Sequence, residues 1–344
     1  MRNLYIVTLE KLDKRYTTQF YAQWKEHFSK DFNVIYIDGT HVEDVIKRGR
    51  FLDINRTNKW KAQQVEGIAD MFDREEVQNG DSFLFMDGWH FGVTALKYMA
   101  QLQGIDVKIY NYMHAGTWDS ADFLAQAGLG VWAKDNELAW FKAADGNFVA
   151  NYFHKLLILD YFNKSYSELE HKIHVVGFPM DWLRTINENT VSNTPVEKEN
   201  LIIFPHRLAP EKQPEVFEQI KMKFPEYNFV RTQDTPRTKS EYYDLMRRAK
   251  IIFSANLQET YGIAVAEGVI LGCVPIVPDR LSYHEMYSDE FKYKTYEQSC
   301  AAIQYFMSHY DDVSTQELIQ KNRTKTLKDS LDAFSKMAEV IKNG

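Results

Sequence analysis

The sequence lacks several features that mark special classes of protein. No apolar run approaches the ~18 residues that a membrane-spanning helix needs. Only two cysteines are present, Cys273 and Cys300, which excludes a disulfide-rich secreted domain and a zinc site built from cysteines alone. The net charge of −7 at pH 7 excludes a polycationic nucleic-acid coat protein. We therefore expect a reduced cytoplasmic protein without stable membrane insertion.

What is present is an alternation of strand patterns with helical patterns. Short apolar runs rich in β-branched and aromatic residues are separated by amphipathic segments such as 18–28 and 92–102, which is typical of parallel β-α-β units. The expected strands are 4–9, 33–38, 82–87, 107–112, 130–133 and 172–177, and, after an interruption, 201–205, 228–231, 250–254 and 274–277. The sequence therefore predicts an α/β protein.

The interruption is a polar stretch in the middle of the chain. Residues 185–200, TINENTVSNTPVEKEN, are rich in Asn and Thr and predict a linker. It would join two doubly wound domains, 1–184 and 201–344, with the last helix, inside 316–342, packed back on the first domain. Ligands of doubly wound folds bind at the carboxyl ends of the strands, so we expect the two domains to face a ligand cleft.

Two acids stand in the small, apolar stretch 259–278, ETYGIAVAEGVILGCVPIVP. Glu259 follows the expected strand 250–254, and Glu267 lies one or two turns into the helix that follows it. Backbone N–H groups at the start of that helix suit a phosphate, and a carboxylate just beyond can accept hydrogen bonds from a ribose diol. The expected nucleotide-binding residues are Thr260, Tyr261, Gly262, Ile263 and Glu267.

This stretch resembles the E-x7-E motif of retaining GT-B glycosyltransferases of the glycogen-synthase and sucrose-synthase type. Gly262, Gly272 and Pro275 stand in the register of the family's pattern. The resemblance implies a GT-B fold, with two Rossmann-like domains facing a central cleft. It also implies that Glu267 binds the ribose of a nucleotide-sugar donor and that Glu259 lies beside the donor sugar. The first domain would then be the acceptor side and the second domain the donor side.

A second motif, Arg207 to Lys212 in the stretch IIFPHRLAPEKQP, resembles the family's R-x-x-x-E-K sequence. The resemblance implies that Arg207 and Lys212 face the donor diphosphate. Two preorganised cations can stabilise the charge that develops on a departing phosphate without a metal ion. The D-x-D motif with which GT-A enzymes hold a metal is absent from the sequence. We therefore expect no metal and no cofactor, and a UDP-sugar as the donor substrate.

The first half of the chain carries weaker signals. His114 follows an expected strand and matches the family's histidine near the donor sugar, which makes it a candidate catalytic residue beside Glu259, Arg207 and Lys212. Asp87 and His90 end another expected strand, so we expect them to line the acceptor side of the cleft. The family's glycine-rich loop after the first strand is absent from the sequence.

One segment of this acidic protein is basic. Residues 47–61, KRGRFLDINRTNKWK, hold six basic side chains and one acid. Contact with a polyanion such as nucleic acid, with an aromatic side chain for base stacking, is one interpretation, and a solvated loop before a helix is the other. The candidate acceptor-binding residues of this segment are Lys47, Arg48, Arg50 and Trp60.

The sequence thus predicts a retaining hexosyl- or pentosyltransferase. The basic segment favours a hydroxymethylated pyrimidine in phage DNA as the acceptor, which would place the enzyme in the host cytoplasm. A glycan or lipid-linked acceptor is the first alternative, and a nucleotide-sugar epimerase of the same fold is the second. A pure binding module is disfavoured because the donor motifs carry a complete set of residues for bond cleavage.

Overall fold

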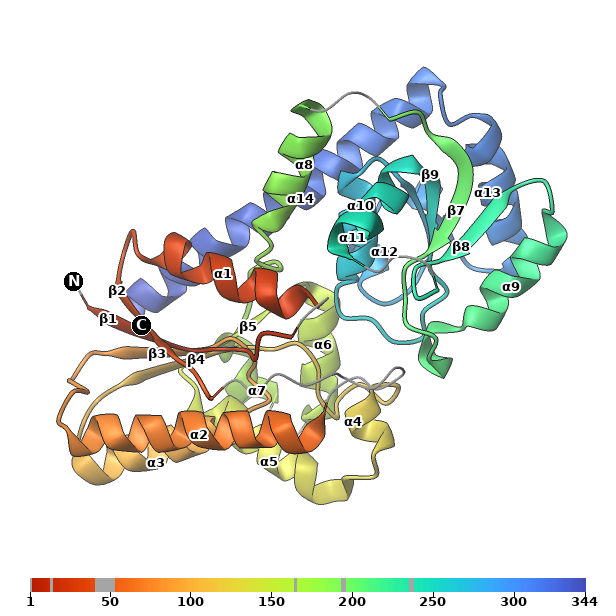
Figure 1. The fold of residues 1–344 in the computed structure, drawn as a ribbon. Coiled ribbons are helices and arrows are strands. Elements are labelled where there is room, and N and C mark those ends of the chain that lie inside the picture. The colour runs from red at the N-terminus through yellow and green to blue at the C-terminus, as the bar shows by residue number, and fades with distance from the viewer. Residues whose placement is uncertain (1, 13–14, 41–52, 164–165, 193–195, 235–237) are drawn as a thin grey trace. The chain divides into compact units, whose positions relative to one another are not determined.

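The computed structural model describes the whole chain except residues 1, 13–14, 41–52, 164–165, 193–195 and 235–237 (Figure 1). The chain forms two compact units. The first contains Met1–Pro179 and Asp332–Gly344, and the second contains Met180–Leu331. Each unit has its own parallel sheet. In the described part of the chain, no helix is both long enough and apolar enough to cross a membrane.

The first unit is built on a six-stranded sheet with the order β2-β1-β3-β4-β5-β6, in which every described strand pairs in parallel. Its strands are β1 Asn3–Val7, β2 Asn33–Ile37, β3 Ser82–Phe85, β4 Lys108–Tyr112, β5 Gly146–Val149 and β6 Ile173–Val175. Its helices are α1 Tyr16–Phe28, α2 Ile54–Asp73, α3 Gly92–Gln103, α4 Phe123–Gln126, α5 Gly130–Ala143, α6 Tyr152–Tyr161, α7 Tyr166–Leu169 and the 3₁₀ turn η2 Glu170–Lys172.

Apolar residues on both faces of this sheet explain why its strands are almost continuously hydrophobic. Figure 1 shows α2, α3 and α5 together on one face, where they bury a cluster that includes Ile68, Leu96 and Trp140. On the other face, α1 packs against the end of the C-terminal helix, and the ring of Phe334 stacks on His27 with centroids 3.9 Å apart. The core therefore fixes the edge from which the loops after β1, β3 and β4 leave the sheet.

The second unit has a five-stranded parallel sheet with the order β11-β10-β9-β7-β8. Its strands are β7 Glu199–Phe204, β8 Asn228–Arg231, β9 Ala249–Phe253, β10 Val274–Pro278 and β11 Lys292–Tyr293. Its helices are α8 Trp182–Ser192, α9 Pro214–Lys223, α10 Lys239–Arg248, α11 Ile263–Ile270, α12 Tyr283–Met286, α13 Tyr296–Ser308, α14 Val313–Asn343, of which the residues from Asp332 belong to the first unit, and the 3₁₀ turns η3 Pro210–Lys212 and η4 Asp289–Phe291.

Helices cover both faces of this sheet as well. Phe217 and Ile220 of α9 and Ile303 of α13 join one buried cluster with the strands, while α10 and α11 lie on the opposite face (Figure 1). Both cysteines, Cys273 and Cys300, are buried and carry free thiols.

One strand prediction is wrong. Residues 130–133 do not form a strand but begin α5, because Ala, Lys, Glu and Leu in the following turns are strong helix formers and a short apolar run does not distinguish the two structures. The strand next to β4 is instead β5, Gly146–Val149, which sequence reasoning missed.

The stretch expected as a linker, 185–200, also differs from the prediction. Residues Trp182–Ser192 form α8, and β7 already begins at Glu199. Asn and Thr have low helix propensity, but Trp182, Leu183 and Ile186 are buried at helical spacing. Tertiary packing of this apolar stripe therefore overrides the polar composition, and the boundary between the units falls earlier, after Pro179.

Candidate functional site

The two motifs predicted in the second unit lie on loops at the point where its strand order reverses. β7 is flanked by β8 on one side and by β9 on the other. Because these strands are parallel, the loops after β7 and β9 leave the same carboxyl-terminal edge of the sheet. Doubly wound sheets bind ligands in the crevice at this position. The fold therefore brings residues 205–213 and 254–262 to a natural ligand site.

The loop after β7 carries Arg207 on its solvent-facing side. Its Nε donates to Oε1 of Glu211 at 2.9 Å, and its side chain is 31% exposed. Partial burial raises the pKa of Glu211, but the hydrogen bonds from Arg207 outweigh this effect and hold the pKa below its usual range. Arg207 is thus oriented by an acid of its own loop and still reaches solvent, where it can meet an anion.

Lys212 ends the same loop and is buried. Its Nζ donates to the backbone oxygen of Gln258 at 2.5 Å and lies 3.3 Å from Oε2 of Glu259. The loops themselves are joined, because the N–H of Leu257 donates to the backbone oxygen of Glu211 at 2.8 Å. The structure therefore brings together two predicted catalytic residues, Lys212 and Glu259.

The helix that follows, α11, begins at a position where only glycine fits. Gly262 has φ +88°, and a Cβ there would lie 2.8 Å from the ring of Tyr283. The Tyr283 hydroxyl accepts from Nδ2 of Asn256 at 3.2 Å, and the same Nδ2 donates to Oε2 of Glu259 at 3.1 Å. The first turn of α11, which begins at Ile263 after the N-cap Gly262, has backbone N–H groups without intrahelical acceptors, and such a helix start suits an anion beside Glu259. The predicted Thr260 and Tyr261 precede this turn.

Glu267, in the middle of α11, is buried in a cage of donors. Oε1 accepts from Nε1 of Trp182 at 3.1 Å and from the hydroxyl of Tyr243 at 2.8 Å. Oε2 accepts from the hydroxyl of Tyr242 at 3.1 Å, and Nζ of Lys239 lies 3.3 Å from Oε1. The pKa of Tyr242 is raised well above its usual value, mainly by burial and secondly by the negative charge of Glu267. The phenol therefore keeps its proton and stays a hydrogen-bond donor. The carboxylate expected to bind ribose is therefore already satisfied by the protein.

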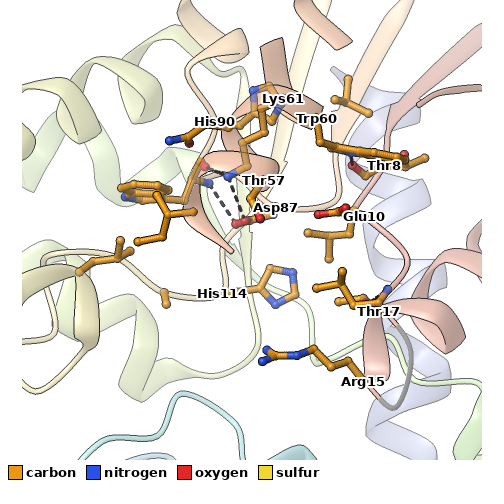
Figure 2. Close-up of a pocket in the computed structure, with 18 of the residues that line it drawn as sticks. Thr8, Glu10, Arg15, Thr17, Thr57, Trp60, Lys61, Asp87, His90 and His114 are labelled. Atoms are coloured by element: carbon orange, nitrogen blue, oxygen red, sulfur yellow. Dashed lines mark hydrogen bonds and ion pairs between the residues drawn. The ribbon is translucent and has the colours of Figure 1, made fainter. Parts of the chain in front are cut away.

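In the first unit, a cavity of about 140 Å³ opens at the corresponding position of its own sheet. β1 is flanked by β2 and β3, and the cavity lies where the chain leaves β1, β3 and β4 (Figure 2). Three of the predicted residues of this half, Asp87, His90 and Trp60, line it together with His114. The four residues thus share one cavity, although they come from distant parts of the sequence.

Asp87 is the carboxylate at the centre of this cavity (Figure 2). Its Oδ1 accepts from the backbone N–H of Trp89 at 3.1 Å, and its Oδ2 lies 3.6 Å from Nζ of Lys61. Lys61 is buried, which lowers the pKa of its amine, while the charge of Asp87 opposes that shift. Lys61 is therefore a charge partner that holds Asp87 in place.

The two histidines of the cavity are neutral but differ in their surroundings. Burial lowers the pKa of both His90 and His114. His90 accepts from the N–H of Gly92 at 2.8 Å and shares a 3.1 Å hydrogen bond with Gln64, so its ring serves the architecture of the loop. Nε2 of His114 lies 2.7 Å from the backbone oxygen of Met86, which requires a proton on Nε2 and a lone pair on Nδ1.

No family model matches the sequence, but solved structures do. The N-terminal domain of trehalose-6-phosphate phosphatase from Candida albicans matches 100% of this chain and 97% of its own, with a TM-score of 0.68 and 11% identity. A UDP-forming α,α-trehalose-phosphate synthase from Burkholderia vietnamiensis matches 100% and 99%, with a TM-score of 0.67 and 9% identity. Sucrose-phosphate synthase from Thermosynechococcus elongatus matches 100% and 99%, with a TM-score of 0.67 and 11% identity. The chain has the GT-B fold.

This finding confirms the predicted fold class of two doubly wound Rossmann-like domains. The structural match over the whole chain shows the GT-B fold, and at identities of 9–11% it shows the fold alone. Among the described residues, no group of three His, Cys, Asp or Glu side chains could hold a metal ion.

In the described part of the basic segment 47–61, the side chains of Trp60 and Arg56 are not placed as an exposed polyanion site would require. Trp60, expected to stack on bases at the surface, is only 3% exposed, and its Nε1 donates to the backbone oxygen of Thr8 at 3.3 Å. Arg56 pairs with the buried Glu10 at 2.7 Å. Apolar burial on α2 explains both placements, because this side of the helix faces the core. Lys47, Arg48 and Arg50 lie outside the described residues.

Sequence reasoning missed the residues that support the GT-B donor-side loops. Arg280 follows β10 at the same sheet edge, and its guanidinium donates to the backbone oxygens of Asn256 at 3.0 Å and Ala255 at 2.9 Å. Its position directly after a strand could have revealed it. The hydrogen-bond donors around Glu267 come from α8 and α10. The positions of these donors in the sequence did not indicate a contact with α11. The missed residues of the two sites are Trp182, Lys239, Tyr242, Tyr243, Asn256, Arg280, Tyr283, Lys61 and Trp89.

Proposed function

We propose that this protein is a retaining glycosyltransferase that moves a hexosyl or pentosyl group from a UDP-sugar to an acceptor hydroxyl. The observation that carries the proposal is the pairing of Lys212 with Glu259 beside the start of α11, at the carboxyl edge of a GT-B sheet. A cation, an acid and a phosphate-accepting helix start are the three elements that a sugar diphosphate needs. The UDP-forming synthase of the same fold supports a uridine diphosphate donor.

In the proposed reaction, the bond between the anomeric carbon and the diphosphate oxygen breaks, and a bond from the acceptor oxygen to that carbon forms on the same face. The proton of the acceptor hydroxyl passes to the departing phosphate oxygen. Arg207 and Lys212 stabilise the charge on that phosphate, Glu259 orients the sugar, and Glu267 contacts the ribose. No step of this reaction calls for a metal ion.

The present partners of Lys212 and Arg207 determine how a donor phosphate could bind to these two residues. The Nζ of Lys212 has three N–H bonds, and its neighbours are the backbone oxygen and Oε1 of Gln258 and the carboxylate of Glu259. A phosphate would take the place of the weakest of these partners, the Gln258 amide oxygen at 3.2 Å. Arg207, with its partly exposed guanidinium, can bind a phosphate while it keeps Glu211.

The donor half of the proposal is tested with nucleotide sugars alone. We expect UDP-glucose or another UDP-sugar to raise the melting temperature by mass action, and Arg207→Ala to weaken its binding by roughly 10-fold or more, because a charge-assisted hydrogen bond to phosphate is removed. Arg248→Ala is the matched control, since Arg248 pairs with Glu199 at the start of β7, at the opposite edge of the same sheet. The proposal fails if no nucleotide sugar binds or is hydrolysed and Arg207→Ala changes nothing.

For the acceptor, we propose a hydroxymethylated pyrimidine in DNA. The exposed Lys59 of α2, together with the basic composition of residues 47–61 in the sequence, supports a polyanion as the acceptor. We expect glucosylation of DNA that contains 5-hydroxymethylcytosine and none of unmodified DNA. Neutralising Lys47, Arg48 and Arg50 should flatten the slope of log K against log salt by about 0.9 for each phosphate that the protein no longer neutralises. Transfer to maltose instead of DNA would contradict the DNA acceptor and leave the donor half standing.

A further inference from the structure

Two unusual backbone conformations of the second unit meet at one side chain, that of Arg280. Among the described residues other than glycine, φ is positive only at Glu75, Gln213 and Leu281. Gln213 accepts a hydrogen bond from Arg280, and Leu281 directly follows Arg280 in the chain. Such conformations cost free energy and persist where the surrounding structure imposes them, often at ligand sites. We infer that Arg280 and Gln213 are positioning residues that hold the predicted catalytic cation and acid of the loops after β7 and β9 in contact.

Gln213 has a backbone conformation that glycine adopts at lower cost. Its φ is +50° and its ψ is 55°, at the junction between η3 and α9. A glycine would lack the side-chain amide, whose Oε1 accepts from Nη2 of Arg280 at 3.2 Å. Lys212 directly precedes Gln213, so this hydrogen bond restrains the part of the loop that carries the predicted cation. The strained residue therefore makes a contact that an unstrained glycine would not make.

Arg280 bridges this loop and the loop after β9. Its Nε donates to the backbone oxygen of Asn256 at 3.0 Å, and its Nη2 donates to that of Ala255 at 2.9 Å. Asn256 is buried, and its Nδ2 donates to Oε2 of Glu259 at 3.1 Å. A carboxylate accepts hydrogen bonds, so the amide must present its nitrogen to Glu259. The planar guanidinium thus restrains the backbone of a residue whose side chain holds the predicted catalytic acid.

These contacts close a path around the predicted catalytic pair, in which Nζ of Lys212 lies 3.3 Å from Oε2 of Glu259. The N–H of Leu257 joins the same two loops, because it donates to the backbone oxygen of Glu211 at 2.8 Å. Without the Arg280 bridge the loops would open more often, and an error of about 1 Å in the position of a catalytic group can cost about 10²-fold in rate. In terms of the proposed function, on which this point alone depends, that error falls on the residues that meet the sugar diphosphate. The closed path runs through Arg280, Gln213, its chain neighbour Lys212, Glu259 and Asn256.

Hydrogen exchange at the Leu257 amide measures the Arg280 bridge without any ligand. We expect Gln213→Asn to raise this exchange rate roughly 10-fold, because Asn tolerates the same backbone conformation but its shorter side chain does not reach Arg280. The melting temperature should not fall, so a general loss of stability would not explain faster exchange. Gln213→Glu keeps an acceptor of the same length and should keep the exchange rate of the unmodified protein. Glu75→Asn, at the exposed third outlier in the first unit, is the matched control and should leave exchange at Leu257 unchanged.

Turnover of UDP-glucose connects the Arg280 bridge with the proposed function. Gln213→Asn should lower kcat roughly 10-fold and change the Kd of UDP-glucose less, because misplaced groups act mainly in the transition state. Unchanged exchange at Leu257, or a fall in melting temperature that accounts for faster exchange, would overturn the inference. Faster exchange with a normal kcat would also overturn it, since the bridge would then serve the structure only. If no UDP-sugar binds and Arg207→Ala changes nothing, the proposed function fails, and the exchange rates alone decide whether the bridge holds the two loops.

Discussion

At the scale of single residues, Glu267 poses the sharpest energetic question. Its side chain is 2% exposed on an apolar helix, and a carboxylate so buried needs all its oxygens paired. A carboxylate has about four lone-pair sites, and Trp182, Lys239, Tyr242 and Tyr243 supply four donors. Oε1 accepts from three of these donors and Oε2 from Tyr242 alone, so a ribose hydroxyl would bind Oε2 beside Tyr242 or take the place of a donor at Oε1. The partly exposed Lys239 is the donor most easily displaced.

The cost of removing this carboxylate follows from its partners. We expect Glu267→Ala to lower the free energy of unfolding by about 3 kcal/mol in the absence of nucleotide, because buried phenol and indole donors lose their acceptor. Tyr243→Phe, which removes one hydrogen bond, should cost about 1 kcal/mol. Urea denaturation measures both values. A loss below about 1 kcal/mol for Glu267→Ala would show that water replaces the carboxylate and that the donor cage contributes little.

At the scale of elements, the turn into α11 decides where a phosphate can bind. Gly262→Ala places a Cβ 2.8 Å from the Tyr283 ring at φ +88°. We expect it to destabilise the second unit by about 1–2 kcal/mol from the backbone conformation alone, and to abolish UDP-sugar binding because the loop must shift. Gly67→Ala in α2 is the matched control, since a Cβ there meets nothing within 4 Å. Gly67→Ala should raise the free energy of unfolding by about 0.5–1 kcal/mol. Thermal melts with and without UDP-glucose separate the two effects, and normal donor affinity in Gly262→Ala would contradict the assigned anion site.

The same scale shows what a sequence can predict. Strands such as Asn228–Arg231 and Val274–Pro278 were predictable because they are short apolar runs bounded by turns. The loop motifs of Arg207, Lys212 and Glu259 were predicted from their resemblance to the family's sequence motifs, and the parallel strands explain why the structure places them on one edge. α8 was not predictable from local preference, because its helix depends on burial of Trp182. The donors to Glu267 depend on how α8 and α10 pack against α11, and this packing cannot be predicted from the spacing of residues in the sequence.

At the scale of the whole molecule, both sheets reverse their strand order next to their first strand, β1 in one unit and β7 in the other. Each reversal opens a ligand position at a carboxyl edge, and each carries one of the two residue groups described above. The pair Lys212 and Glu259 in the second unit and the pair Asp87 and His114 in the first unit are therefore expected to respond to separate sets of substitutions.

A decrease in pH should lower the free energy of unfolding because of the buried histidines. Burial lowers the pKa of His90 and His206 well below the usual value and that of His154 to about 3, so these rings stay neutral in the fold while the unfolded chain takes up protons below about pH 6.5. The unfolded state then binds more protons, and stability falls as the pH decreases. Between pH 7 and 5.5, the loss is about 1 kcal/mol for each histidine.

His154 allows this proton uptake to be assigned. Its Nε2 accepts from Nε1 of Trp118 at 3.2 Å, and the amide oxygen of Gln can accept the same bond. We expect His154→Gln to reduce the loss of unfolding free energy between pH 7 and 5.5 by about 1 kcal/mol, because one titrating group is gone. Urea denaturation at the two pH values measures it, above the range in which carboxylates titrate. An identical loss in both proteins would mean that His154 takes up its proton without unfolding, and that the first unit opens enough around Trp118 to admit water.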